Sequence, residues 1–314
     1  FEGFKMLKKT LTTVFLFAST TAFSNMTVTT TIYPLYSIAK EIGADKIKLQ
    51  NLIPFGVEAH GFDPTPADMA KLSKSDIFIT SSDSMEPWKD KIVKSLKIEE
   101  KVFDMSKYVK LRTLQEENDE HHEDEKGHKH EHDHDHEHEG IDPHYWVSLN
   151  NYILMTETIT KLFIEKDSVN KDFYIQNSNN YLAKIKALKE KYDLSMATCT
   201  NKKILVNHDA FGYFADDYGV TQHSISGMSP EDKPSAKQIS ELIDLVKYEK
   251  INTVFFEEFA SPKVAQTIAK AANVKIDTLR PAENISKEEN KKGYGYLQIM
   301  EDNLEKLKFA MDCK

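Results

Sequence analysis

Apolar and polar positions alternate with two different periods along this chain of 314 residues. Short runs rich in β-branched and aromatic residues predict strands, and stretches with apolar residues every three or four positions predict helices. The first half predicts strands at 26–32, 46–53, 76–82 and 101–105, and helices at 35–42, 66–72 and 86–96. The second half predicts strands at 203–207, 221–226, 252–257 and 274–279, and helices at 210–219, 235–250, 261–273 and 294–311.

The middle of the chain, 150–197, has no convincing strand. Residues 169–197 contain no Pro or Gly. Five large residues in this range fall on one helical face: Tyr174, Tyr181, Ile185, Leu188 and Tyr192. Such a helix would be roughly 40 Å long at about 1.5 Å per residue. It suits a rigid strut between lobes, and an ordinary long surface helix is the alternative. Alternating strands and helices on either side predict an α/β fold. We expect two doubly wound parallel-sheet lobes, 25–149 and 198–314, joined by the helical segment 150–197.

An acidic histidine-rich tract lies inside the first predicted lobe. Residues 115–140 contain twelve Asp or Glu and two Lys, a balance of −10, so the rest of this chain of net charge −9 sums to +1 and is near neutral. The tract holds eight of the twelve histidines: His121, His122, His128, His130, His132, His134, His136 and His138. Imidazole beside carboxylate is a ligand set for borderline ions such as Zn²⁺. Without apolar residues the tract is expected to be a disordered loop, and a near-neutral remainder argues against a nucleic-acid partner.

The N-terminus has the pattern of a secretory signal peptide. Met6 is followed by two lysines, a short apolar run over 11–17, and the small-x-small sequence at 22–24. We expect cleavage near Ser24 and a mature chain from Asn25, with 1–5 lying upstream of the initiator. The apolar run is too short to span a bilayer permanently. No cysteine lies at the cleavage point, which disfavours a lipid anchor, and the predicted location is the periplasm.

Two cysteines remain, Cys199 and Cys313. In an exported chain we expect them to form one disulfide that ties the C-terminal helix to its lobe. Two free thiols are the alternative. Their wide spacing argues against a cysteine metal site.

Four histidines lie outside the tract, and three of them share a position in the predicted fold. His60 follows the strand 46–53, His208 ends the strand 203–207, and His144 lies where the tract ends and a helix begins. Ligands of open α/β sheets bind outside the carboxyl ends of strands, so two facing lobes would bring these histidines together. Three imidazoles suit Zn²⁺. His223 lies inside a predicted strand and is expected to be structural.

Six segments resemble the zinc and manganese solute-binding proteins of ABC importers, over nearly the whole mature chain. They are TIYPLY (31–36), GVEAHGFDPTPADMAKLSKSD (56–76), DPHYWVSL (142–149), VNHDAFGYFADDYG (206–219), MSPEDKPSAKQISELI (228–243) and FFEEFASPKVAQTIAKAA (255–272). The resemblance is closest to the periplasmic zinc branch, which often carries a His-rich acidic loop. It implies two lobes, one long helix, and a metal held by His60, His144 and His208. The manganese branch commonly has a carboxylate at the third position, so His208 favours zinc.

Two departures from the family leave the fourth ligand open. A family segment resembling TLDP supplies an Asp, whereas this chain reads TLRP and places Arg280 there. A guanidinium cannot ligate a cation. Some zinc members have Glu directly before the first His, but here that residue is Ala59, and Glu58 precedes it. We expect water as the fourth ligand, with Glu58 as the protein alternative. Arg280 is expected to pair with a carboxylate such as Glu257, or to be a solvated surface charge.

The predicted function is zinc capture and delivery to a membrane permease by a monomeric carrier. The tract has three interpretations: it captures zinc for the cleft, senses occupancy, or is a passive linker. A manganese or iron carrier of the same family is the nearest alternative. A zinc hydrolase with an open three-His site is another, although no HExxH or GxSxG motif occurs. An adhesin or an extracellular metal buffer is a third.

Overall fold

The computed structural model describes residues 25–113 and 140–314. The predicted signal peptide and the eight tract histidines lie outside these ranges. The strands are β1 (Met26–Thr30), β2 (Ile47–Asn51), β3 (Ile77–Thr80), β4 (Val102–Asp104), β5 (Arg112–Thr113), β6 (Ile141–Asp142), β7 (Lys203–Val206), β8 (Thr221–Ser224), β9 (Thr253–Phe256) and β10 (Lys275–Thr278). The α-helices are α1 (Tyr33–Gly43), α2 (Pro66–Leu72), α3 (Lys89–Leu96), α4 (Leu149–Lys166), α5 (Lys171–Met196), α6 (Gly212–Tyr218), α7 (Ala236–Tyr248), α8 (Lys263–Ala272), α9 (Lys287–Lys291) and α10 (Tyr296–Ala310).

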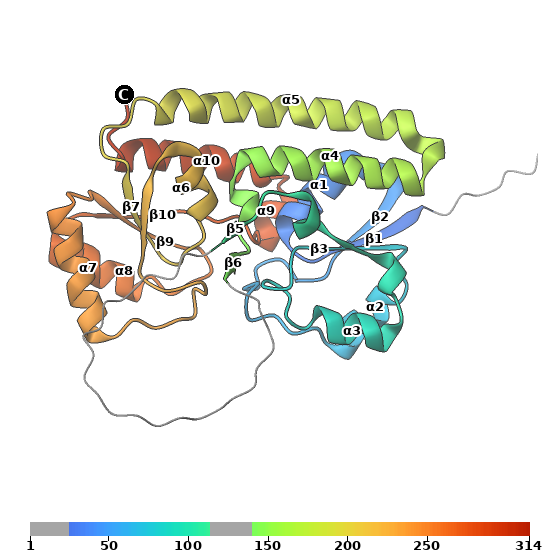
Figure 1. Cartoon of the computed structure of the whole chain (residues 1–314), viewed down its shortest axis with the longest axis horizontal. Coiled ribbons are helices and arrows are strands. Elements are labelled where there is room, and N and C mark those ends of the chain that lie inside the picture. The colour runs from blue at the N-terminus through green and yellow to red at the C-terminus, as the bar shows by residue number, and fades with distance from the viewer. Residues whose placement is uncertain (1–24, 114–139) are drawn as a thin grey trace, which may run out of the picture.

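Two four-stranded parallel sheets form the two halves of the molecule (Figure 1). The first has the order β2-β1-β3-β4, and the second has the order β10-β9-β7-β8. Read from the other edge, the second order repeats the first, because β7 takes the place of β1 and β8 that of β2. The predicted α/β class with two parallel sheets is therefore confirmed. Carboxyl ends of strands in both sheets face the space between the halves, which is where ligands of such sheets bind.

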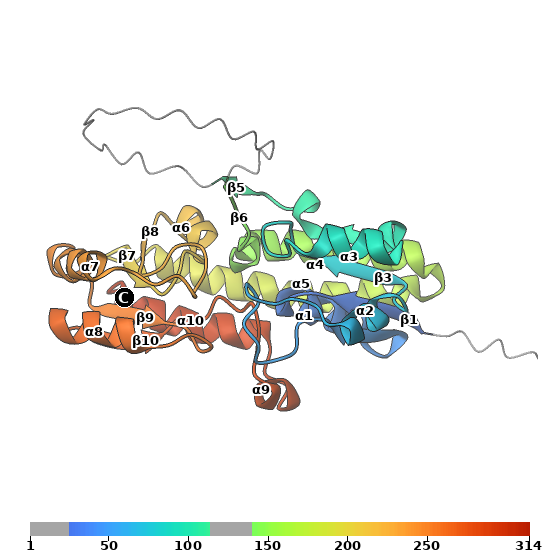
Figure 2. The same cartoon turned by 90° about the horizontal axis from the view of Figure 1, so that it is seen from below.

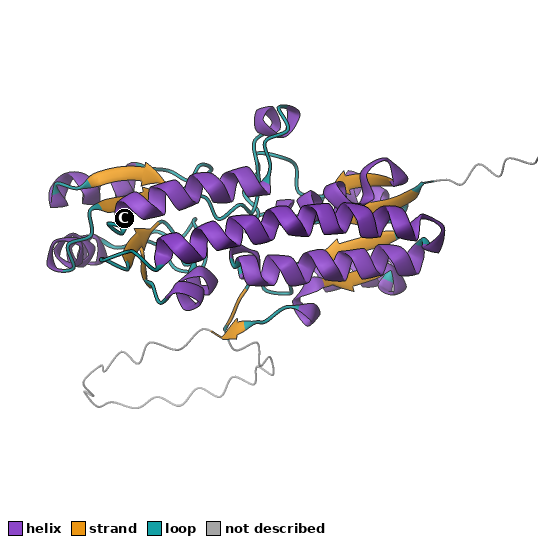
Figure 3. Cartoon of the chain, turned by 90° about the horizontal axis from the view of Figure 1, so that it is seen from above, coloured by secondary structure: helices purple, strands orange, loops and turns teal. Residues whose placement is uncertain are grey.

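A layer of long helices covers both sheets (Figures 1 and 3). Helix α5 has 26 residues and extends about 39 Å at about 1.5 Å per residue. It packs against α1 of the first half, against α4, and against α10 of the second half. The predicted apolar face is confirmed, since all five of its residues are buried. One core cluster runs from the first sheet through these helices into the second half.

Tyrosines hold the helix layer together. The rings of Tyr152 in α4 and Tyr296 in α10 stack with centroids 3.7 Å apart. The hydroxyl groups of Tyr152 and Tyr181 in α5 lie 3.0 Å apart, and that of Tyr181 lies 3.4 Å from Ser37 in α1. Buried aromatic pairs add about 0.5–1.5 kcal/mol beyond their buried area. Four helices from both halves are thereby fixed to one another.

The sequence did not predict two small elements. Strands β5 and β6 form an antiparallel ribbon that flanks the tract. Short helix α9 projects from the body of the molecule (Figure 2). Both contain too few residues for a periodic signal, so only their tertiary contacts define them. In the described ranges, no helix combines the length and the apolar character needed to cross a membrane.

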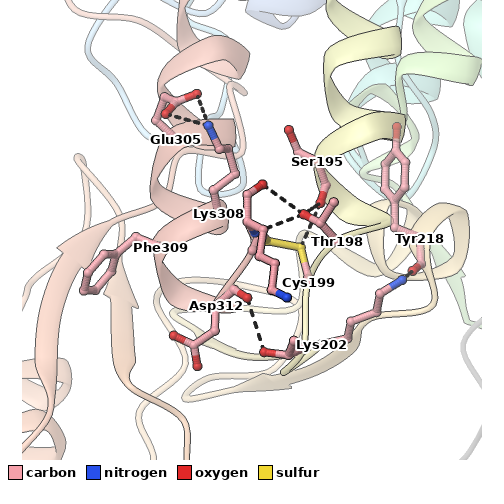
Figure 4. Close-up of a disulfide and its surroundings, with 12 residues drawn as sticks. Ser195, Thr198, Cys199, Lys202, Tyr218, Glu305, Lys308, Phe309 and Asp312 are labelled. Carbon is pink, nitrogen blue, oxygen red and sulfur yellow. Dashed lines mark hydrogen bonds and ion pairs between the residues drawn. A yellow bond between two sulfur atoms is a disulfide. The ribbon is translucent and has the colours of Figure 1, made fainter.

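A disulfide joins Cys199, just after α5, to Cys313, just after α10 (Figure 4). It links positions 114 residues apart. Closing a loop of that size removes chain entropy from the unfolded state, and native disulfides typically contribute about 2–4 kcal/mol. The bond therefore connects the end of the long helix to the end of the chain.

Replacing both cysteines by serine is expected to lower the thermal unfolding midpoint by roughly 5–10 °C, at about 2–4 °C per kcal/mol for a chain of this size. Zinc affinity is expected to stay within about twofold of wild type, because the bond lies at the ends of α5 and α10, away from the predicted ligands His60, His144 and His208. Calorimetry and zinc titration measure the two quantities. Wild-type protein under reductant should reproduce the variant, and a large loss of affinity would contradict this separation.

Candidate metal centre

Four side chains meet between the two sheets: His60, His144, His208 and Glu283. His60 lies in the loop after β2, and His208 lies two residues after β7. His144 follows β6 and precedes a 3-10 turn at Tyr145–Val147. Glu283 lies between β10 and α9. Three of the four thus follow carboxyl ends of parallel strands, and the structure brings the three predicted histidines together in one cluster.

The donor atoms have the spacing of a tetrahedral zinc site. Five of their six separations are between 3.2 and 3.4 Å. The Nε2 atom of His144 lies 3.2 Å from those of both His60 and His208. The Oε1 atom of Glu283 lies 3.3, 3.2 and 3.4 Å from the Nε2 atoms of His60, His144 and His208. Donors bound to Zn²⁺ at about 2.0–2.1 Å in a tetrahedron lie about 3.3–3.4 Å apart. Five of the six donor separations therefore match a tetrahedral zinc site.

Carboxylates orient two of the three imidazoles. The Nδ1–H of His144 donates to Asp142 at 2.8 Å, and that of His208 donates to Glu257 at 2.6 Å. Each bond leaves the Nε2 lone pair directed at the centre, as in most protein metal sites. Among the described residues, His60 has no such carboxylate on Nδ1. Its side chain is 11% exposed, whereas those of His144 and His208 are fully buried.

The charges of the cluster are strongly coupled. Burial alone would lower the pKa of His144, but hydrogen bonds to Asp142 and Glu283 raise it above the ordinary histidine value. The pKa of His208 is raised well above that value, because Glu257 and Glu283 outweigh burial. Burial would raise the pKa of Glu283, yet the three histidines hold it well below the usual range. Without metal, positive imidazolium groups and a negative carboxylate thus stabilise one another.

The loop that carries His60 is fastened to the segment that carries Glu283. The side-chain amide of Asn284 donates to the carbonyl oxygens of Pro54 and Val57, at 2.9 and 2.6 Å. The backbone N–H of Tyr33 donates to the carbonyl oxygen of Glu283 at 2.9 Å. These bonds join the first half to a segment of the second. The position of Glu283 therefore depends on both halves.

The structure places the expected fourth-ligand candidates differently. Glu58 lies outside the donor group, and its Oε1 accepts hydrogen bonds from the backbone N–H groups of Ala59 and His60. Burial and the neighbouring Glu283 raise the pKa of Glu58. Arg280 pairs with carboxylates, as expected, but Glu257 is not among them. Arg280 pairs with Glu258 at 2.6 Å and with Glu289 at 2.9 Å, because Glu257 is bonded to His208.

Sequence reasoning missed Glu283. It lies just past the strand that ends at Thr278, so the rule that selected the histidines applies to this carboxylate as well. It is 6% exposed. The Nε2 atom of His223 lies 2.7 Å from Oε2 of Glu249, within hydrogen-bond distance. This contact agrees with the expected structural role of His223.

Comparison with known proteins places this geometry in a family. The family model described as the periplasmic component A of the zinc-uptake complex, ZnuA, matches residues 28–310. The high-affinity zinc uptake system protein ZnuA of Bacillus subtilis is 38% identical over 288 residues, covering 91% of this chain and 88% of that protein.

Two streptococcal comparisons agree. The zinc-binding lipoprotein AdcA of Streptococcus pneumoniae is 33% identical over 93% of this chain, which spans 57% of that longer protein. The crystal structure of the Zn(II)-bound ZnuA-like domain of AdcA has a TM-score of 0.75 and 31% identity, covering 92% of this chain and 100% of that domain.

Proposed function

This chain belongs to the ZnuA family of zinc-uptake components, and from that premise we propose that it binds Zn²⁺ outside the cytoplasm and delivers it to the membrane permease of an ABC importer. The observation that supports this proposal most strongly is the largely buried group of three imidazoles and one carboxylate, in which five of the six donor separations match a tetrahedron. We assign His60, His144, His208 and Glu283 as the zinc ligands. Asp142 and Glu257 orient two of the imidazoles.

The donor set supports zinc over harder ions. Imidazole nitrogens suit Zn²⁺, whereas Mn²⁺ favours sites richer in carboxylate and water oxygen. A fourth protein donor also supports a carrier over a zinc hydrolase, because catalytic zinc keeps an open position for water. A carrier must hold the ion without using it in a reaction, and four protein donors around the ion serve that purpose.

Titration calorimetry tests the assignment of the binding site. A variant that lacks residues 114–139 is expected to retain tight zinc binding with unchanged stoichiometry in the high-affinity phase. His60→Ala is expected to lose that phase in both backgrounds, because one of four donors is gone. Tight binding that disappears with the segment but survives His60→Ala would overturn the assignment of the central site.

We further propose that the histidine-rich segment captures zinc weakly and passes it to this site. Deleting 114–139 is then expected to slow loading from a competing chelator severalfold while leaving the equilibrium affinity unchanged, because a second set of imidazoles raises the local zinc concentration. Stopped-flow competition measures the rate. Replacing the eight histidines by glutamine keeps length and acidity and separates imidazole from carboxylate effects. Equal loading rates in all three proteins would eliminate the capture role.

We place the mature protein in the periplasm after cleavage of the leader, as a monomer, with the permease as its partner. The near-neutral charge outside the histidine-rich segment supports a carrier that diffuses freely between metal source and membrane.

A further inference from the structure

The β5–β6 ribbon is held by a helix from the other half of the molecule. Arg112 of β5 and Asp142 of β6 face each other in the ladder. The hydroxyl of Tyr213, in α6, accepts a hydrogen bond from the backbone N–H of Arg112 at 2.8 Å and donates one to the carbonyl oxygen of Asp142 at 2.7 Å. One side chain of α6 therefore binds both strands.

The side chain of Arg112 continues this contact toward the metal centre. Its Nη1 lies 3.4 Å from Oδ2 of Asp142, and its Nε donates to Asp216 of α6 at 3.0 Å. The other oxygen of Asp142, Oδ1, accepts from both the backbone N–H and the Nδ1–H of His144, at 3.0 and 2.8 Å. The Asp142 carboxylate thus connects a guanidinium on one side with a zinc ligand on the other.

Gly212 makes room for this pair. A Cβ atom at Gly212 would lie 2.6 Å from Nη1 of Arg112 and 2.7 Å from Oδ2 of Asp142. Both distances are shorter than any ordinary contact, and the Asp142 side chain is fully buried and held by His144. The first residue of α6 must therefore be glycine for the ion pair to keep its place.

We propose that Arg112 is a positioning residue for the zinc ligand His144, that it acts through Asp142, and that Gly212 and Asp216 of α6 set its place. The inference rests on the proposed zinc-binding function. Arg112 does not touch the donor group, and its side chain is 32% exposed. Its effect is to fix the buried carboxylate in the one orientation that directs the Nε2 atom of His144 at the centre.

Loss of Arg112 differs from loss of an ordinary surface ion pair. Exposed pairs contribute little to stability, but Asp142 is completely buried. Without the guanidinium, Oδ2 loses its charged partner inside the protein, which is costly unless the carboxylate turns. Turning it would break the bond to Nδ1 of His144. Variants of carboxylates and other groups that orient metal ligands typically lose about 10–100-fold in metal affinity.

The test measures zinc affinity of the full chain by chelator competition for Arg112→Met, Arg112→Lys, Asp142→Asn and the double variant Arg112→Met/Asp142→Asn. Arg112→Met is expected to lose about 10–100-fold, and Arg112→Lys is expected to recover part of the loss. In the Asp142→Asn background, Arg112→Met is expected to lower zinc affinity by no more than about twofold, because the effects of two residues that act through the same contact are not additive. Lys110→Met removes a neighbouring charge that forms no ion pair with the described residues, and should stay within about twofold of wild type.

Two results would overturn the inference. One is a loss of zinc affinity in the double variant equal to the product of the losses in Arg112→Met and Asp142→Asn, and the other is an Arg112→Met affinity within twofold of wild type. The visible spectrum of the Co²⁺-loaded protein adds a second readout, since displaced His144 changes the ligand field in Arg112→Met but not in Lys110→Met. If Arg112→Met does not fold, Gly212→Ala and Arg112→Lys decide by the same comparison. Failure of the proposed function is distinct: wild type itself would then lack tight zinc binding, or His144→Ala would retain it.

Discussion

Glu283→Gln is expected to weaken zinc binding on the order of 100-fold, or roughly 2.8 kcal/mol at about 1.4 kcal/mol per tenfold change. Glutamine keeps the size of the side chain but replaces a charged donor by a neutral amide. The three imidazoles then face an uncharged group, and the fourth position loses its attraction for a dication. Competition against a chelator of known affinity measures the change.

Glu58→Gln is the matched control for this prediction, because it makes the same chemical change close to His60. Glu58 lies outside the donor group and bonds to backbone N–H groups of its own loop. We therefore expect less than about a fivefold loss of affinity for this variant. The reverse ranking, with Glu58→Gln the weaker binder, would mean that Glu58 is the fourth donor.

The second large effect is an opposite dependence on pH of the metal-free and zinc-loaded proteins. Folding raises the pKa values of His144 and His208. Their contribution to metal-free stability is therefore complete below the unfolded-state pKa of about 6.5 and is lost as pH rises through the raised pKa values. Glu283 has a lowered pKa, so its contribution is present above about 4.3 and is lost as pH falls through the lowered value. Metal-free protein should be most stable between these limits.

Zinc binding has the opposite trend, because each protonated imidazole must release its proton before it can ligate. Two protonated histidines make the affinity fall by up to about 100-fold per pH unit in the range where both are charged. At a free zinc concentration 1,000 times the dissociation constant, binding stabilises the fold by about 4 kcal/mol. We therefore expect zinc to raise the unfolding midpoint by about 10 °C at pH 8, and by much less at pH 5.5.

Scanning calorimetry from pH 5 to pH 8.5, with and without zinc, measures both trends. Titration in buffers of different ionisation enthalpy counts the protons that zinc releases. His208→Gln removes a histidine whose pKa is raised well above the ordinary value, so any zinc binding that remains in this variant should release fewer protons. A zinc effect on the unfolding midpoint that does not change between pH 5.5 and 8 would contradict the coupled cluster.

Local sequence patterns were sufficient for most of the architecture. Strand and helix periods placed the elements of both sheets within a few residues, because each element buries one face and the spacing of apolar residues records it. The stripe from Tyr174 to Tyr192 marked α5 for the same reason. Ribbon β5–β6 and helix α9 were not predicted. Strands of two residues and a helix of five are too short to show a period, and the position of the ribbon depends on tertiary partners such as Tyr213.

The histidine-rich tract dominates the composition, yet the described metal centre consists of residues scattered over more than 220 positions, from His60 to Glu283. Composition draws attention to the tract, whereas placement at strand ends selected His60 and His208. Glu283 was not expected as the fourth donor, because the family pattern points to the positions of Ala59 and Arg280 and not to the next carboxylate after Arg280.

From its sequence alone, this protein could be assigned two parallel-sheet lobes, a long connecting helix and three histidines expected to bind metal, since residue type and local spacing encode each of these. The expected preference for zinc came from imidazole chemistry together with the family resemblance. Only the tertiary structure could place Glu283 rather than Glu58 beside the imidazoles, turn Arg280 toward Glu258 and Glu289, and connect Arg112 through Asp142 to His144. Those pairings join segments distant in the chain, and their distances follow from how the two halves pack, which no local pattern records.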